Sequence, residues 1–218
     1  YKDEGYLDSA ILNTLARLGW SKGDKEIFYL ADLIKDFEIT EVQKAGAIFD
    51  VTKLDFLNSQ HMANLSHEDF IVAINPFLDD LGININNHPK KDLLIESMRS
   101  SANTLKGVSN NLICYFKEIE NYDQKAVDKF IRGSDKVLVD IKEKIGGMNT
   151  WDESSLDNIL LEYREEKELS IPKVNQPIRI ALTGSTNSPS LGITLYLFEK
   201  EKVLERLDAL IAFVHKDN

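Results

Sequence analysis

Apolar side chains recur every three or four residues along nearly every long segment of this 218-residue chain. That spacing gathers them on one face of an α-helix, whereas the alternation of a half-buried strand is rare and short here. The sequence therefore predicts a mainly α-helical fold of two consecutive helical bundles, with a joint between about residues 110 and 125. Helices are expected at residues 10–18, 30–37, 66–73, 90–98, 125–130, 135–145, 156–163, 188–198 and 201–214, with a further one beginning at 52.

Small and polar residues indicate where the first helices begin and end. Gly19 follows the first apolar stripe and is expected to be its C-cap, and Thr52 is expected to be an N-cap. Ser66 precedes Asp69 in a run whose acids suit the positive end of a helix dipole. Pro76 is a candidate interruption of that helix.

The composition is that of an ordinary globular protein, with 43% apolar and 28% charged residues. At roughly 150 residues per domain, the length allows one large domain or two small ones. No apolar run approaches the roughly 18 residues that cross a bilayer, so no membrane contact is expected. Cys114 is the one cysteine, which rules out an internal disulfide, favours the cytosol and predicts a core thiol rather than a nucleophile. The start at Tyr1 instead of methionine indicates a fragment.

The charge is unevenly spread. The whole chain carries −10, with −8 in residues 1–88, +2 in residues 89–150 and −4 in residues 151–218. Nucleic-acid binders are usually basic, so the total argues against a generic binder of DNA or RNA. A polyanion would be expected to meet the middle segment or a local basic face.

The motifs of common enzyme sites are absent from the sequence. It has no Gly-rich phosphate loop, no Cys-x-x-Cys or His-x-x-His metal spacing and no Gly-x-Ser-x-Gly elbow. The four histidines are scattered through helix ends and turns, and paired carboxylates look like solvated faces. We expect no catalytic residue, no metal site and no cofactor in this chain.

Residues 176–191 hold the most informative local pattern. Arg179 follows Pro177 in an apolar run that ends at Gly184, and a loop rich in Ser, Thr and Pro comes next. A guanidinium in an apolar run is costly without partners. Either it caps the last carbonyls of its own helix, or the loop groups hold it for a ligand. Ser188 with the proline after it also fits a simple N-cap and first-turn proline.

Four separated motifs, in order, carry a resemblance to a known family. They are the run from Asp8 to Trp20, the run from Phe49 to Asn58, the residues from Gln176 to Arg179 with Ala181 to Gly184, and the amphipathic run from Lys202 to Leu207. Together they resemble the C-terminal half of bacterial glutamyl-tRNA synthetase over nearly the whole chain. The family's two ATP-handling signatures are not found here.

The resemblance implies that successive stretches of the chain contact different parts of a tRNA. Residues 1–65 would be the end of a helical stem-contact region, 66–118 the first helical anticodon-binding domain and 119–218 the second. The parent enzyme would use ATP with magnesium, in a catalytic domain missing here, to attach glutamate to tRNA(Glu). The chain alone is then expected to dock tRNA, to bind no cofactor, to be inactive, and to be a cytoplasmic monomer.

The resemblance also implies the contacts. Arg179, Ser188 and Leu191 would flank the first two anticodon bases. Ser101 stands where relatives that reject tRNA(Gln) carry an arginine that checks the third base, so our hypothesis is that tRNA(Gln) is accepted too. The alternative is that Arg99 or Lys106 takes over that check.

The N-terminal stretch holds candidate contacts to the tRNA stem, and its acidity leaves a second function open. Lys53 and Asn58 are candidate polar contacts to the tRNA stem, and Trp20 is expected in the core. The competing function is an acidic helical adaptor that binds another protein and no RNA, which the −8 segment favours. A free-standing enzyme is disfavoured by the missing motifs.

Overall fold

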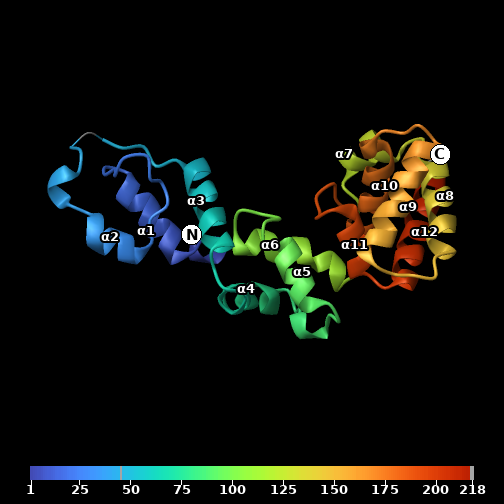
Figure 1. Ribbon diagram of the computed structural model, residues 1–218, viewed down its shortest axis with the longest axis horizontal. Coiled ribbons are helices and arrows are strands. Elements are labelled where there is room, and N and C mark those ends of the chain that lie inside the picture. The colour runs from blue at the N-terminus through green and yellow to red at the C-terminus, as the bar shows by residue number, and fades with distance from the viewer. Residues whose placement is uncertain (45, 217–218) are drawn as a thin grey trace. The chain divides into compact units, whose positions relative to one another are not determined.

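A computed structural model describes residues 1–44 and 46–216 of the chain (Figure 1). Within those ranges it contains twelve α-helices and no strand, apart from a single bridge between Lys22 and Lys25. The mainly α-helical prediction is confirmed. No helix in the described ranges is long and apolar enough to cross a membrane.

The chain divides into two compact units, each made of two stretches. The N-terminal unit comprises Tyr1–Asn87 and Arg99–Asn111, and the C-terminal unit comprises His88–Met98 and Leu112–Asn218. The boundaries expected at residues 65 and 118 do not coincide with the ends of these units. As assignments of function, those boundaries stay predictions.

Helices α1 and α3 form the centre of the N-terminal unit, where they pack against each other. Trp20, Phe28 and Leu33 form a buried cluster beside them, so the prediction for Trp20 is confirmed. The elements of the unit are η1 (Lys2–Glu4), α1 (Asp8–Arg17), α2 (Leu30–Asp36), η2 (Ile39–Glu41), α3 (Val51–Ala63), α4 (His67–Asp80), η3 (Ile85–Asn87) and α6 (Leu105–Leu112), the last to Asn111.

Two predicted caps in this unit are wrong. The N-cap of α3 is Asp50, whose carboxylate accepts from the backbone N–H of Thr52 at 2.9 Å, so α3 begins one residue before Thr52. The C-cap of α1 is Leu18, and Gly19 keeps a negative φ. Gly19 is needed for space, because a Cβ there would lie 2.9 Å from Cγ1 of Val42.

The start of α4 follows the prediction. Ser66 is its N-cap and accepts from the backbone N–H of Asp69 at 3.0 Å. Pro76 does not interrupt the helix, which runs on to Asp80.

Helices α8 to α12 form the C-terminal unit together with shorter elements. Helix α12 packs against α8 and α10, and α11 packs against α9. At that second contact the carboxylate of Asp157 lies against Gly192, where a Cβ would require the aspartate side chain to move. The elements are α5 (Lys91–Met98), η4 (Ile113–Tyr115), α7 (Gln124–Ala126), the π-helix η5 (Val127–Ile131), α8 (Asp135–Gly146), α9 (Glu153–Glu166), α10 (Ile171–Thr183), α11 (Leu191–Leu197) and α12 (Lys200–Lys216).

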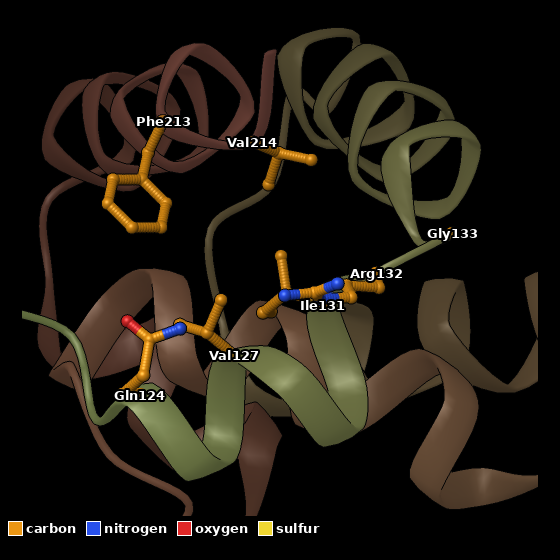
Figure 2. A pocket seen from close by; sticks show the side chains of 7 residues that line it. All are labelled: Gln124, Val127, Ile131, Arg132, Gly133, Phe213 and Val214. Atoms are coloured by element: carbon orange, nitrogen blue, oxygen red, sulfur yellow. The ribbon is translucent and has the colours of Figure 1, made fainter. Parts of the chain in front are cut away.

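A small hollow of about 110 Å³ lies between the π-helix and the C-terminal end of α12 (Figure 2). Apolar side chains dominate its lining, and its one arginine, Arg132, is paired with Asp128 at 2.9 Å. The hollow has space for a few water molecules. The residues that line it are Gln124, Val127, Ile131, Arg132, Gly133, Phe213 and Val214.

Candidate functional site

Arg179 lies one turn before the end of α10. Pro177 is buried inside the helix, and the helix ends at Gly184, whose φ of 73° is left-handed. A left-handed residue at this position is the usual glycine stop, because a Cβ would be strained there. The chain then turns back through the Ser- and Thr-rich residues 185–190, which meet the Arg179 side chain.

The guanidinium of Arg179 is held by this loop and not by the carbonyls of its own helix. Its Nε donates to Oγ of Ser188 at 2.7 Å, and its Nη2 donates to the carbonyl of Pro189 at 3.1 Å. The interpretation of Arg179 as a cap of its own helix is therefore wrong. The third nitrogen, Nη1, has no hydrogen-bond partner and is not sealed from solvent within the described ranges.

Burial holds the pKa of the half-buried Arg179 below its ordinary value. An arginine nevertheless keeps its charge near neutral pH. The loop thus bonds Nε and Nη2 of the charged Arg179 guanidinium and leaves the donors on Nη1 unbonded among the described residues. This arrangement suits a ligand that carries hydrogen-bond acceptors.

Ser188 accepts from Arg179 and does not cap a helix. Its Oγ also lies 2.9 Å from Oγ1 of Thr194, a side chain that is fully buried. The N-cap of α11 is Ser190, whose Oγ accepts from the backbone N–H of Ile193 at 3.3 Å. The simple N-cap interpretation of Ser188 is therefore wrong.

Two threonines in this site were missed from the sequence. Thr183 donates its hydroxyl to the carbonyl of Arg179 at 2.9 Å and accepts from the backbone N–H of Ser185 at 3.2 Å. Thr194 donates back to the carbonyl of Ser190 at 2.9 Å. A hydroxyl four residues after a helical carbonyl is the only sequence signal for such bonds, and it is weak.

The structure argues against a base contact for Leu191. Only 3% of this residue is exposed, since it belongs to the core beneath the loop. Leu191 begins the buried face of α11, which also includes Leu195, so its position gives no support to this prediction.

Ser101 lies in the N-terminal unit and is held by one neighbour. The side-chain amide of Asn111 donates to the carbonyl of Ser101 at 3.1 Å and to its Oγ at 3.3 Å. Ser101 is half-buried and short, and Asn111 fixes the direction of its hydroxyl.

Arg99 and Lys106, the two alternatives to Ser101, have different surroundings. Arg99 donates to the carbonyl of Leu65 at 2.9 Å and lies 4.7 Å from the ring centre of Phe70, so it holds its own segment against α4 and the turn before α4. Lys106 forms a surface ion pair with Glu4 at 2.9 Å. Arg99 is thus committed to the fold, whereas Lys106 has a side chain that is 45% exposed.

The two residues proposed for the stem contact separate in the same way. Asn58 is fully buried, where its Nδ2 donates to the carbonyl of Asn103 at 2.6 Å and its Oδ1 accepts from the N–H of Leu7 at 2.8 Å. That burial gives no support to a contact from Asn58 to RNA. Lys53 is 37% exposed and pairs with Glu26 at 3.3 Å beside a hollow of about 200 Å³.

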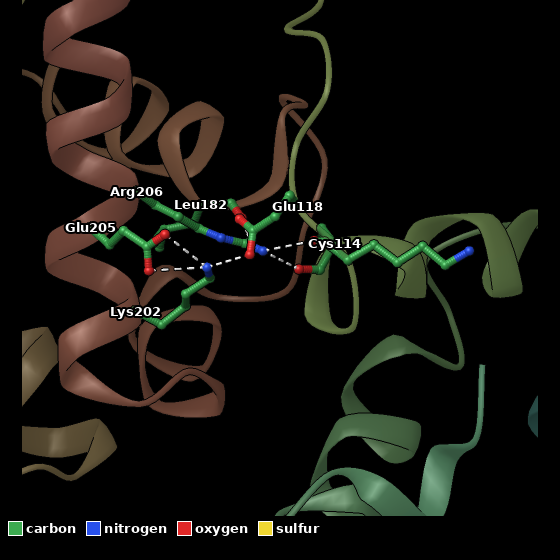
Figure 3. Close-up of polar contacts among 7 residues, drawn as sticks. Cys114, Glu118, Leu182, Lys202, Glu205 and Arg206 are labelled. Carbon is green, nitrogen blue, oxygen red and sulfur yellow. Dashed lines mark hydrogen bonds and ion pairs between the residues drawn. The ribbon is translucent and has the colours of Figure 1, made fainter. Parts of the chain in front are cut away.

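One buried arginine was not singled out from the sequence. Arg206, on α12, is 5% exposed, and its donors reach the carbonyls of Leu182, Cys114 and Lys117 (Figure 3). Its sequence signal is position, because it falls on the apolar stripe of Val203, Leu207 and Leu210.

The described residues contain no group of three or more histidine, cysteine or acidic side chains able to hold a metal. Burial raises the pKa of Cys114 to about 12, so its thiol is protonated at neutral pH. The raised pKa argues against a nucleophile, although Cys114 is only half-buried and not a full member of the core.

Comparison with known proteins identifies the relatives of this chain. Residues 69–211 match the family model described as the anticodon binding domain, and residues 1–56 match the model described as tRNA synthetases class I (E and Q), catalytic domain. A glutamate–tRNA ligase of Coxiella burnetii is 32% identical over 217 residues, covering 99% of this chain and 46% of that protein. A glutamate–tRNA ligase of Halorhodospira halophila is 33% identical over 218 residues, covering 100% and 46%.

Solved structures agree with the sequence matches. A glutamate–tRNA ligase from Elizabethkingia meningosepticum has a TM-score of 0.82 at 27% identity, covering 98% of this chain and 43% of that one. The enzyme from Elizabethkingia anophelis has a TM-score of 0.79 at 28% identity, covering 97% and 42%. The resemblance inferred from the four motifs is confirmed. The chain spans less than half the length of the curated relatives it matches.

Proposed function

Since the chain belongs to the anticodon binding domain family, we propose that it docks tRNA and reads anticodon bases as part of a glutamate–tRNA ligase. The whole enzyme would use ATP, with magnesium, to attach glutamate to tRNA, and both would bind outside this chain. Residues 69–211 cover most of the two stretches, 66–118 and 119–218, that we assign to the anticodon. The stretch 1–65 is assigned to the tRNA stem.

The observation that supports this proposal is the Arg179 guanidinium, which has two of its nitrogens bonded to protein and the third unbonded within the ranges that the structure describes. Ser188 and Pro189 fix its orientation through Nε and Nη2, which leaves the Nη1 donors for a ligand. Unstacked bases in an RNA loop expose edges with paired acceptors, which a planar fork can meet with parallel bonds. Because the fork is held before binding, little side-chain entropy is lost when a base arrives.

Docking would proceed in two physical steps. Exposed lysines such as Lys53 and Lys106 would meet phosphates and provide affinity that salt weakens. Arg179 would then distinguish bases at the first two anticodon positions, with Ser101 next to the third. We place the enzyme in the cytoplasm and its RNA-bound form as a monomer.

Replacing Arg179 tests the site. Arg179→Ala is expected to weaken binding of tRNA(Glu) by about 1–3 kcal/mol, because donors to a base edge are lost. Arg132→Ala is the matched control, since it removes an equal charge from an exposed residue that pairs with Asp128, four residues before it. Fluorescence anisotropy with labelled tRNA measures both. Equal affinities for the two variants would take Arg179 out of the site.

A salt series tests the function itself. Affinity for tRNA should fall at least about tenfold between about 50 and about 200 mM salt, because phosphate contacts release counterions. An acidic adaptor would show no tRNA binding at any salt concentration. No comparison with a known protein favours that adaptor.

A further inference from the structure

Arg206 occupies a position in the core where an arginine is unusual. It follows Val203 by three residues and precedes Leu210 by four, and both of those side chains are fully buried. Burial lowers the pKa of Arg206 from its ordinary value. A buried guanidinium needs bonded donors to offset its lost hydration.

Main-chain carbonyls, and not carboxylates, supply those bonds (Figure 3). Nη1 donates to the carbonyl of Leu182, while Nη2 donates to Cys114 at 2.7 Å and to Lys117 at 3.0 Å. The guanidinium also lies 4.6 Å from the ring centre of Phe198. The guanidinium therefore joins α12 to the last turn of α10, to η4 and to the turn after η4.

The acids nearby are engaged by a different cation. Lys202 pairs with Glu118 and, at 3.0 Å, with Glu205 (Figure 3). Figure 3 shows this lysine network beside the arginine. Lys202 thus neutralises the charges of Glu118 and Glu205, and the bonds of Arg206 fix main-chain geometry.

The carbonyl of Leu182 lies between the parts of the candidate site. Arg179 precedes it by three residues, and Thr183, which bonds both Arg179 and Ser185, follows it. The carbonyl of Gly184 accepts from the N–H of Asp123 at 3.2 Å. The start of the loop at residues 184–190 is therefore held on both sides.

We propose that Arg206 is a positioning residue for anticodon reading: it fixes the end of α10 so that loop 184–190 can hold the Arg179 guanidinium. This rests on the proposed function. A lysine cannot replace it, because one ammonium on a flexible stem does not bond Leu182 and Cys114 in a planar fork.

The test compares Arg206→Lys with Arg132→Lys, an identical substitution at an exposed residue of the same unit. Three quantities are measured on the 218-residue chain: hydrogen exchange of peptides covering 183–190, affinity for tRNA(Glu), and affinity for tRNA(Glu) changed at the second anticodon base. The same variants are repeated on an Arg179→Ala background, which forms a double-mutant cycle.

In Arg206→Lys, we expect faster exchange in residues 183–190 and a loss of about fivefold or more in affinity for tRNA(Glu). The preference over the changed tRNA should shrink as well. On the Arg179→Ala background the same substitution should change affinity less than about twofold, since its effect passes through Arg179. Arg132→Lys should leave all three quantities unchanged.

Unchanged exchange in the loop would overturn the proposal, and so would equal losses on both backgrounds. If the unmodified chain binds no tRNA, the proposed function fails, while loop exchange still decides whether Arg206 positions the loop. Should Arg206→Lys not unfold cooperatively in urea, Phe198→Leu provides the comparison, because it removes the ring under the guanidinium and keeps the fork.

Discussion

Several arginines in the described part of the chain bond main-chain carbonyls. Arg179 holds Pro189, Arg206 holds Leu182, and Arg99 holds Leu65. A guanidinium has five donors in a fixed plane, so one side chain can join two or three segments. An arginine on the apolar stripe of a helix therefore indicates a nearby loop that the guanidinium holds in a defined conformation.

Ser101 makes the specificity hypothesis testable. Ser101→Arg is expected to reduce affinity for tRNA(Gln) by about tenfold or more and to leave affinity for tRNA(Glu) nearly unchanged. The reason is that a guanidinium, which only donates hydrogen bonds, matches the third anticodon base of tRNA(Glu) and opposes that of tRNA(Gln). Affinities of both tRNAs for the original chain and the variant measure this. Ser154→Arg, the same substitution at an exposed serine with no proposed role, is the matched control. A hundredfold preference for tRNA(Glu) in the unmodified chain would contradict the hypothesis.

Single residues were the least predictable part of the site. The sequence indicated Arg179 and Ser188, because an arginine in an apolar run beside hydroxyls needs partners. It did not indicate that Asn58 and Leu191 would be buried, since a polar residue can bond buried backbone groups and an apolar residue beside a loop can belong to the core. Which of two neighbouring residues faces the core depends on contacts from distant segments, such as Asn103 on Asn58.

Most helices were predicted from periodicity, but α6 and α10 were not, and several helix ends were wrong. The stripes in α8, α9 and α12 fall on buried residues within a few positions of the predicted ranges. The π-helix at Val127–Ile131 was read as an ordinary helix, because its wider turn has no clear sequence signal. Caps depend on which side chain points back at the first turn, which a residue type alone does not decide.

The cap of α3 gives a prediction at this scale. Asp50→Ala is expected to destabilise the chain by about 0.5–2 kcal/mol, because the N–H groups of Thr52 and Lys53 lose their acceptor. Thr52→Ala is the control and should change the free energy of unfolding by less than about 0.5 kcal/mol. Urea unfolding followed by circular dichroism gives both values. A larger loss from Thr52→Ala would restore the threonine as the cap.

Each compact unit buries a histidine, which links the stability of the whole molecule to pH. His61 is 1% exposed in the N-terminal unit and His88 is 8% exposed in the C-terminal unit. Burial lowers the pKa of both, and the charge of Lys90 lowers the pKa of His88 further. In His88, Nδ1 accepts from the N–H of Lys90 at 3.1 Å, a bond that a protonated ring cannot make.

Stability should therefore decline on the acidic side of neutrality. The unfolded histidines take up protons near pH 6.5 while the folded ones resist, so the free energy of unfolding falls as pH drops below about 6.5. The slope contributed by each histidine is at most about 1.4 kcal/mol per pH unit. Urea unfolding at intervals between about pH 7.5 and about pH 5.5 measures it. His61→Gln with His88→Gln should flatten the curve, and an equally steep curve in that double variant would assign the effect to other groups.

The division of the chain has a practical consequence for anyone who shortens it. Because each unit is assembled from two separate stretches, no single truncation isolates either one. Ending the polypeptide at residue 118 would remove α11, a helix that α5 contacts, and would expose apolar surface of α5, whose buried residues are Leu94, Ile95 and Met98. A soluble product that contains only the N-terminal unit would need α5 replaced by a short polar linker between residues 87 and 99.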